Sequence, residues 1–232
     1  MFGFIKNWFR ANKLNKRANK FKTEIDEVVK KGRKQLHLVN RNLNSDDIKL
    51  LADMLKEFKT LTKLNLNGNV AGEEGAKALA EALKVNKTLT HLDLDYNRIG
   101  DEGAIALADG LKDNDSLIYL DLRWNKMGCK GAKAFAEVLL MNKTLIKLNL
   151  EGNNAGDEGV VALAEALKVN KTLTHLYIKQ NDIGNAGAKA LLDVLKENDT
   201  LKKIDISSND IDVEHSFLLK SLPRVKSGKL KI

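Results

Sequence analysis

The sequence predicts an α/β solenoid with the shape of a horseshoe, in which parallel strands line the concave face and helices cover the convex face. Three observations indicate this fold. The 232 residues contain an internal repeat with a period of 28 residues, and the hydrophobic pattern changes its period inside each unit. The chain also has one proline and no Gly/Ser-rich linker, which indicates one continuous body rather than two domains.

The first half of each unit predicts a short strand. Two aliphatic residues separated by one position recur seven times without an insertion, from Leu36 and Leu38 to Ile204 and Ile206. Because side chains alternate between the faces of a strand, the aliphatic pair enters the core and its neighbours face outward. An asparagine follows each pair, except in the first unit, where Arg41 takes its place, and we expect it to bond the backbone of its own turn and the next. These residues are Asn69, Asn97, Asn125, Asn153, Asn181 and Asn209.

The second half of each unit predicts a helix. In the second unit the apolar residues within 76–83 recur at the spacing i, i+3, i+4, i+7, which is one face of a helix. Acidic pairs such as Glu73 and Glu74 open these helices, where the helix dipole favours negative charge. A glycine follows the acidic pair, as at Gly75, and we expect it to allow close packing of neighbouring helices.

Both ends of the chain predict caps over the open core. At the C-terminal end, His215 and Ser216 replace the Gly and Ala of the other units, and we expect Pro223 to stop any helix. The predicted organisation is a basic leader and capping helix over 1–34, seven repeats over 35–210 and a C-terminal cap over 211–232. The N-terminal cap is predicted from one helical stripe formed by Leu14, Ala18, Phe21, Ile25, Val28 and Val29.

The repeated strings resemble those of leucine-rich-repeat proteins. LTKLNLNGN, LTHLDLDYN, LIYLDLRWN and LIKLNLEGN match the pattern L-x-x-L-x-L-x-x-N, and the resemblance extends from residue 36 to about residue 210. A period of 28 with a full helix in each unit is similar to the ribonuclease-inhibitor-like class, which includes the repeat domains of NOD-like receptors and resembles the Ran GTPase-activating proteins. That class mostly binds proteins through its concave side and its ends, so the resemblance implies a protein-binding module that is not an enzyme.

Two stretches three units apart indicate a duplication. Residues 68–92 and 152–176 agree at 21 of 25 positions. The outward strand positions that follow them have changed between the copies, whereas the helix positions Lys84, Asn86 and Lys87, which we expect to be exposed, are the same in the second copy. We interpret this contrast as the sign of a binding face, with drift on any exposed surface as the alternative.

The predicted binding face is centred on two neighbouring strands. Tyr96, Tyr119 and Trp124 lie there beside Arg123, and Tyr, Trp and Arg are the residue types enriched in binding hot spots. Tyr96 and Trp124 occupy one position on adjacent strands, so the rings should touch across about 5 Å. Mutual shielding of the rings is the alternative to a binding role.

Carboxylates around the rings predict an acidic face suited to a basic protein partner. A second, weaker patch is predicted further along the sheet, around His175. The residues predicted to surround the rings or to form the second patch are His91, Asp93, Asp95, Asp121, Tyr177 and Lys179.

Catalysis and cofactors have little support in the sequence. It contains no G-x-x-x-x-G-K-[ST] phosphate loop and no G-x-S-x-G motif. The single cysteine, Cys129, excludes a disulfide framework and suits a reducing compartment. We therefore expect a cytoplasmic monomer without a cofactor or metal. A GTPase regulator of the Ran-activator type is an alternative function.

The N-terminal leader carries the net charge of the chain. Eleven Lys and Arg residues within 1–34 face three acids, which accounts for the whole net charge of +8. The body is therefore neutral, which disfavours nucleic acid as its partner. The leader could fold back over the cap, contact an anionic membrane surface through residues 1–22, or engage another partner. A membrane-associated adaptor, or a microbial effector delivered into a host cytoplasm, would use its apolar residues Phe2, Phe4, Ile5, Trp8 and Phe9.

Overall fold

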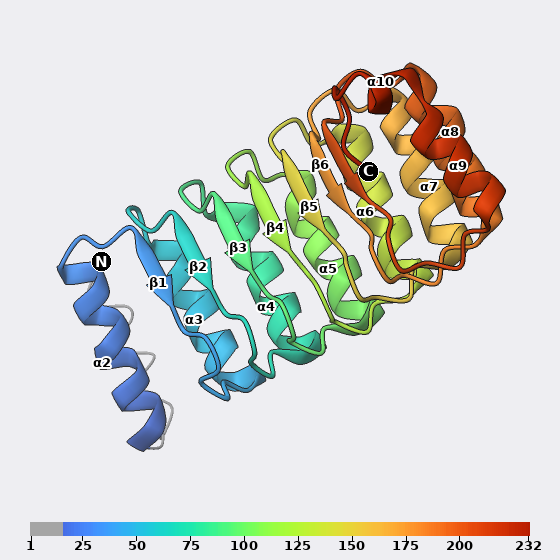
Figure 1. Cartoon of the computed structure of the whole chain (residues 1–232). Helices are drawn as coiled ribbons and strands as arrows, with labels where there is room; N and C mark the ends of the chain where they lie inside the picture. The colour runs from blue at the N-terminus through green and yellow to red at the C-terminus, as the bar shows by residue number, and fades with distance from the viewer. Residues whose placement is uncertain (1–15) are drawn as a thin grey trace.

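The computed structural model describes residues 16–232 and contains one open parallel sheet in which seven strands follow each other in chain order (Figure 1). Neighbouring strands pair with a shift of one unit, so Leu64 lies opposite both Leu36 and Leu92. The predicted α/β solenoid is thereby confirmed. The strands are β1 (Gln35–His37), β2 (Lys63–Asn65), β3 (His91–Asp93), β4 (Tyr119–Asp121), β5 (Lys147–Asn149), β6 (His175–Tyr177) and β7 (Lys203–Asp205).

A long helix follows each of the first six strands and packs against the helices of the neighbouring units, forming the layer behind the sheet in Figure 1. The aliphatic pairs of the strands and the apolar faces of the helices meet in one continuous core, where Leu120 and Leu163 are fully buried. The helices are α3 (Ser45–Glu57), α4 (Gly72–Val85), α5 (Gly100–Lys112), α6 (Cys129–Met141), α7 (Gly156–Val169) and α8 (Asn185–Glu197).

Glycine brings neighbouring helices together, as expected. A Cβ atom on Gly103 would lie 3.0 Å from the Cβ of Ala76 on the preceding helix. Gly110, which the sequence pattern does not single out, marks a second close approach between α4 and α5, because a Cβ there would lie 2.6 Å from the carbonyl oxygen of Ala80. This close helix packing supports the regular spacing of the strands.

The recurrent asparagines after the strands form the predicted ladder, with one correction. Asn97 Nδ2 donates to Asp95 O in its own turn (2.9 Å) and to Leu66 O (2.9 Å), which belongs to the preceding unit rather than the next. The backbone N–H of Asn97 in turn donates to Asn125 Oδ1 (3.0 Å). Each side chain therefore reaches backward, because the open carbonyl and N–H groups of a turn point toward the following unit.

A second asparagine ladder follows the helices and was not predicted. Asn86 Nδ2 donates to Leu55 O (2.7 Å) in the preceding unit, and its Oδ1 accepts from the backbone N–H of Leu89 (2.8 Å). Asn86 is only 1% exposed, so the expectation that it is an exposed helix position is wrong. Buried backbone groups need partners, which is sufficient reason for the same residue in both copies. The members of this ladder are Asn86, Asn114, Asn142, Asn170 and Asn198.

Acidic pairs open α4, α5 and α7, as predicted, and two of these acids also cap the next helix. Asp101 Oδ1 accepts from the backbone N–H groups of Gly128 (2.9 Å) and Gly131 (2.8 Å) at the start of α6. Asp157 does the same at the start of α8. Helices α6 and α8 have no acid in their own first turn, so a carboxylate from the preceding unit supplies the cap.

Helix α2 (Lys16–Lys30) lies at the N-terminal end of the sheet (Figure 1). Phe21 and Ile25 are buried in the core, and Val28 packs against it in a half-buried position. Leu14 lies outside the described residues, as do the side chains of Ala18 and Val29.

The C-terminal segment follows β7 with α9 (Val213–Ser221) and α10 (Pro223–Lys226). Helix α9 ends before Pro223, as expected, but Pro223 does not stop every helix, because proline suits the first helical position and here opens α10. The chain then returns beside β7, where the N–H of Ile204 donates to Lys231 O (2.8 Å). This contact occupies backbone groups that an edge strand would otherwise expose.

Candidate protein-binding face

Tyr96 and Trp124 form a stacked pair, here called the aromatic platform, in the turns after β3 and β4. The ring centroids are 5.7 Å apart and the planes differ by 15°, which confirms the predicted contact. The backbone φ angles are 53° and 52°, in the left-handed region. Asn40, Gln180 and Ser208 occupy the same position in other units with φ of the same sign. The turn is therefore a property of the repeat, and the side chain placed on it is free to vary.

A glycine in the next unit supports the platform. A Cβ atom on Gly152 would lie 2.4 Å from Cδ2 of Trp124, so the indole ring lies directly against the Gly152 backbone. Tyr96 stacks on Trp124 and is 54% exposed. The platform therefore presents aromatic surface to solvent from a position that packing holds on one side.

Asp121 and Asp95, which the sequence places on the exposed face, are buried and bonded. Asp121 is 1% exposed; its Oδ2 accepts from the hydroxyl of Tyr119 (2.7 Å) and its Oδ1 from Nε of Arg123 (3.1 Å). Asp95 is 4% exposed, and its Oδ2 accepts from Asn67 Nδ2 (2.8 Å) and pairs with the guanidinium of Arg123 (3.1 Å). Arg123 thus braces two carboxylates from neighbouring units.

These contacts correct the expected acidic character of the face. The expectation required free carboxylates at Asp95 and Asp121, and both are enclosed by donors from the same face. Asp93 is half-buried, and its Oδ1 accepts from the backbone N–H of Asp95 (3.1 Å). Arg123 and Tyr119 are likewise committed to contacts inside the face. The expectation of a basic partner therefore loses its structural basis.

Burial controls the ionisation of this cluster. It raises the pKa of Asp95 to about 6, although the attraction of Arg123 acts in the opposite direction. Asp95 Oδ1 is also buried without a hydrogen-bond partner among the described residues. Burial and the bond to Asp121 raise the pKa of Tyr119, and burial raises the pKa of Asp93. The cluster is therefore a structural unit whose charge depends on pH.

His91 extends the ring surface toward the start of the strands. Its ring centroid lies 5.8 Å from that of Tyr119, and its Nδ1 lies 2.8 Å from the hydroxyl of Thr90. Burial, followed by the charges of Lys63 and Lys147, lowers the pKa of His91. A neutral imidazole beside a phenol adds ring surface to the face.

The predicted second patch lies over β6 and β7. Lys203 Nζ lies 4.9 Å from the ring centroid of Tyr177, in a cation–π arrangement, and the His175 ring is 6.4 Å from that of Tyr177. Lys179 Nζ is 3.4 Å from Glu151 Oε1. This patch therefore combines aromatic and cationic groups. Tyr177 and Lys203 belong to the strands themselves, whereas the rings of the platform lie in the turns that follow β3 and β4.

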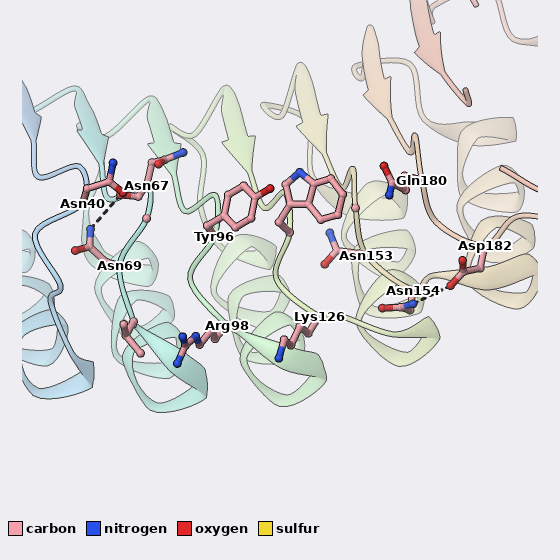
Figure 2. Close-up of a pocket in the computed structure, with 14 residues that line it drawn as sticks. Asn40, Asn67, Asn69, Tyr96, Arg98, Lys126, Asn153, Asn154, Gln180 and Asp182 are labelled. Carbon is pink, nitrogen blue, oxygen red and sulfur yellow. Dashed lines mark hydrogen bonds between the residues drawn. The ribbon is translucent and has the colours of Figure 1, made fainter. Parts of the chain in front are cut away.

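A hollow of about 850 Å³ lies beside the aromatic platform, at the loops that join the strands to the helices. Figure 2 shows Arg98 and Lys126 in neighbouring loops on the helix side of Tyr96. The sequence prediction did not include these cations, because it considered only the strand positions and the turn directly after them. The hollow is lined by Tyr96, Trp124, Arg98, Lys126, Asn154 and Asp182, together with Val70, glycines and further amides.

The remaining predicted contacts involve the leader. Phe2, Phe4, Ile5, Trp8 and Phe9 lie outside the described residues. Within residues 16–232, no helix combines the length and apolar character that crossing a membrane requires. The same part of the chain contains no cluster of three or more His, Cys, Asp or Glu side chains arranged to hold a metal ion.

Comparisons with known proteins place this geometry in context. The family profile described as Leucine Rich repeat matches residues 59–80, 85–108, 113–136, 142–164, 169–192 and 197–214, which together exceed half of the chain. A comparison of the sequence with curated proteins finds no match.

Two solved structures are similar to the chain. The C-terminal domain of tropomodulin from Caenorhabditis elegans has 16% identity and a TM-score of 0.53, covering 78% of this chain and 93% of that one. Leiomodin-1 actin-binding site 2 has 22% identity and a TM-score of 0.43, covering 88% of this chain and 86% of that one. The likeness to the tropomodulin domain supports the solenoid fold.

Proposed function

The chain belongs to the leucine-rich-repeat family, and from this premise we propose that it binds a protein partner on its concave face, with the aromatic platform as the anchor. Repeat proteins of this kind use extended concave surfaces for binding. In this proposal His91 and Asp93 contact the partner beside the platform, and Arg123, Asp95 and Asp121 hold the face in shape from within.

The exposed stack of Tyr96 on Trp124 is the observation that carries the proposal. Large aromatic residues that are rigidly placed before binding lose little conformational entropy when a partner covers them. Packing against Gly152 holds the indole, while more than half of the Tyr96 surface stays open to solvent. If the two rings served only to shield each other, we would expect Tyr96 to be covered.

A displayed peptide library tests the proposal. Peptides would be selected on the wild-type protein and compared on a Tyr96→Gln, Trp124→Ser variant, which carries the residues that the second copy has at Gln180 and Ser208. We expect selected peptides to lose at least about tenfold in affinity on this variant. A Gln180→Ala, Ser208→Ala variant is the matched control and should keep binding. Selection of peptides that bind all three proteins equally would contradict a platform-centred site.

Two alternatives stay predictions. Membrane contact through Phe2, Phe4, Ile5, Trp8 and Phe9 predicts that liposome binding disappears when residues 1–10 are removed. A GTPase regulator of the Ran-activator type predicts stimulated GTP hydrolysis by a partner.

The second patch around Tyr177 and Lys179 is proposed as an additional contact for a partner long enough to reach β6.

A further inference from the structure

The loops after the strands carry a polarised row of charges. In each unit, one loop residue lies two positions after the residue that corresponds to Tyr96 or Trp124. These positions, several of which line the hollow, are here called the loop-edge row. Its charge changes sign along the solenoid, with two cations after β3 and β4, a neutral residue after β5 and two anions after β6 and β7. In chain order the row reads Asn42, Val70, Arg98, Lys126, Asn154, Asp182 and Asp210.

The two cations of the loop-edge row have no ion-pair partner among the described residues. Arg98 and Lys126 are both exposed, and both line the hollow beside the aromatic platform. Asp182 lines the same hollow and accepts a hydrogen bond from Asn154 Nδ2 (2.7 Å). Asp210 is exposed at the next position of the row.

Many lysines of the helical face form ion pairs, unlike Arg98 and Lys126. Lys84 pairs with Glu81 (2.8 Å) and with Asp109 of the next helix (2.9 Å), and Lys133 pairs with Glu158 (2.6 Å). Similar pairs to an acid within one helix or in the neighbouring unit occur at Lys49, Lys56, Lys77, Lys112, Lys168 and Lys196. Acids thus accompany these cations, whereas the loop-edge cations stand beside rings and amides.

The duplication makes this charge pattern informative. Arg98 corresponds to Asp182 and Lys126 corresponds to Asp210, because the copies are three units apart. The φ angles of Arg98 and Asp182 are 58° and 56°, so the charge has been inverted on the same backbone. Opposite charges at corresponding positions give the two ends of the row different preferences.

We propose that the loop-edge row binds one polypeptide segment in a fixed orientation, with acidic side chains over Arg98 and Lys126 and basic side chains over Asp182 and Asp210. This inference rests on the proposed function, since the platform lies beside Arg98 and Lys126 and anchors the acidic end of the bound segment. Strands about 4.8 Å apart place the two charge pairs about 14 Å apart, a span that about four extended residues cover. Charge complementarity of this kind mainly sets specificity and orientation.

A polypeptide fits the row better than a polyanion does. A nucleic acid strand or an anionic membrane surface repeats the same charge, so contact with Arg98 and Lys126 would bring it against Asp182 and Asp210. Residues 35–232, which include the row, also add no net charge, because the whole net charge of +8 comes from residues 1–34. Only a segment that changes sign along its length satisfies both ends of the row.

Two fluorescent peptides of equal composition provide the test. The block peptide carries two adjacent glutamates and two adjacent lysines with about two neutral residues between them, so that the centres of the two pairs lie about four residues apart. The mixed peptide carries one glutamate and one lysine at both places. We expect anisotropy titrations to show at least about tenfold tighter binding of the block peptide to the full chain. Reversal of the cations, by Arg98→Asp and Lys126→Asp, should remove this preference.

A matched charge reversal on the helical face is the control. Lys130 and Lys189 are exposed residues of α6 and α8, and Lys130→Asp with Lys189→Asp changes the net charge by the same amount. We expect this variant to keep the preference for the block peptide. The proposal would be overturned if the wild type bound both peptides equally, or if both charge-reversal variants lost the preference for the block peptide to the same extent.

Two further measurements separate this inference from other outcomes. If both peptides bind equally but lose affinity on the Tyr96→Gln, Trp124→Ser variant, the platform site stands and the charge inference alone fails. A single-stranded oligonucleotide or a phosphatidylserine vesicle provides the comparison with polyanions. Binding of either that is tighter than the block peptide and is lost on reversal of Arg98 and Lys126 would overturn the assignment to a polypeptide.

Discussion

The turns at Tyr96 and Gln180 occupy corresponding positions of the two copies and share one backbone conformation, with φ of 53° and 55°. Their surroundings differ. Tyr96 stacks on Trp124, whereas the position of Trp124 is taken by Ser208 in the second copy. At these turns and in the loops after them, the first copy therefore presents rings and cations, and the second presents uncharged polar side chains and anions.

Below these turns, the copies remain alike. Asn97 and Asn181 are both fully buried, and their Nδ2 atoms donate to Leu66 O and Leu150 O at 2.9 Å in each case. The buried bonds fix the shape of the unit, and the outward positions can change without disturbing it. The comparison therefore separates residues that determine the fold from residues that determine what the fold binds.

The largest effect is expected where the copies share the core. Leu120 and Ile204 occupy the same inward strand position and are fully buried. We expect Leu120→Ala to reduce the free energy of unfolding by about 2–5 kcal/mol, because the truncation leaves a cavity. Chemical denaturation measures this loss. If the variant unfolds at the wild-type denaturant concentration, the separation into inward and outward positions is wrong.

The asparagine ladder should respond equally in both copies. Asn97→Ala and Asn181→Ala each leave buried backbone groups without partners, and we expect each to cost about 1–3 kcal/mol of unfolding free energy. Asn154→Ala is the matched control, since Asn154 is exposed and bonds another exposed side chain; it should cost less than about 0.5 kcal/mol. A large difference between the two buried variants would show that the copies are not structurally equivalent.

The repetition made the fold predictable from the sequence. A strand pattern and a helix pattern that recur seven times in register leave few alternatives, and the placement of Leu64 opposite Leu36 and Leu92 follows from the period. The same argument places Tyr96 against Trp124. Residues whose environment depends on the period alone were therefore predicted correctly.

Residues whose environment depends on individual side chains were not predicted correctly. Asp95 and Asp121 occupy outward strand positions, yet Arg123 and Asn67 enclose them through contacts across units. Periodicity contains no information on such pairs. Asn86 follows the apolar stripe of its helix and is polar, which suggests exposure, but its amide satisfies buried backbone groups.

Asp95 predicts a pH-dependent difference in stability within the first copy. Its pKa is about 6 in the folded protein against an ordinary value of 3.8, so between these values the folded state holds a proton that the unfolded state releases. The contribution of Asp95 to stability therefore falls as the pH rises through this window. We expect Asp95→Asn to become more stable relative to the wild type from pH 4 to pH 7.

Unfolding curves of both proteins at several pH values measure this difference. The corresponding residue of the second copy is Lys179, so no equal effect is expected there. A stability difference between Asp95→Asn and the wild type that is constant with pH would contradict a raised pKa at Asp95.

A small effect on stability is expected at the platform itself. Trp124→Ser installs the residue that the second copy carries at Ser208, on a turn that already accepts serine with φ of 55°. We expect the unfolding free energy to change by less than about 1 kcal/mol, while affinity for a platform-dependent peptide falls by more than about 1 kcal/mol.

Because of Gly152, we expect that placing the two rings on the second copy does not transfer the binding site to it. Trp124 lies against the Gly152 backbone, where a Cβ atom would be 2.4 Å from the ring. Within the described residues, β7 is followed by α9 and α10 rather than by another strand of the sheet, so Ser208→Trp would install a ring without a glycine of a following repeat to support it. We expect Gln180→Tyr with Ser208→Trp to leave a weaker anchor than the platform, as measured by binding of the same peptide to a Tyr96→Gln, Trp124→Ser background. Full recovery of affinity would mean that the rings alone, rather than their packed placement, determine binding.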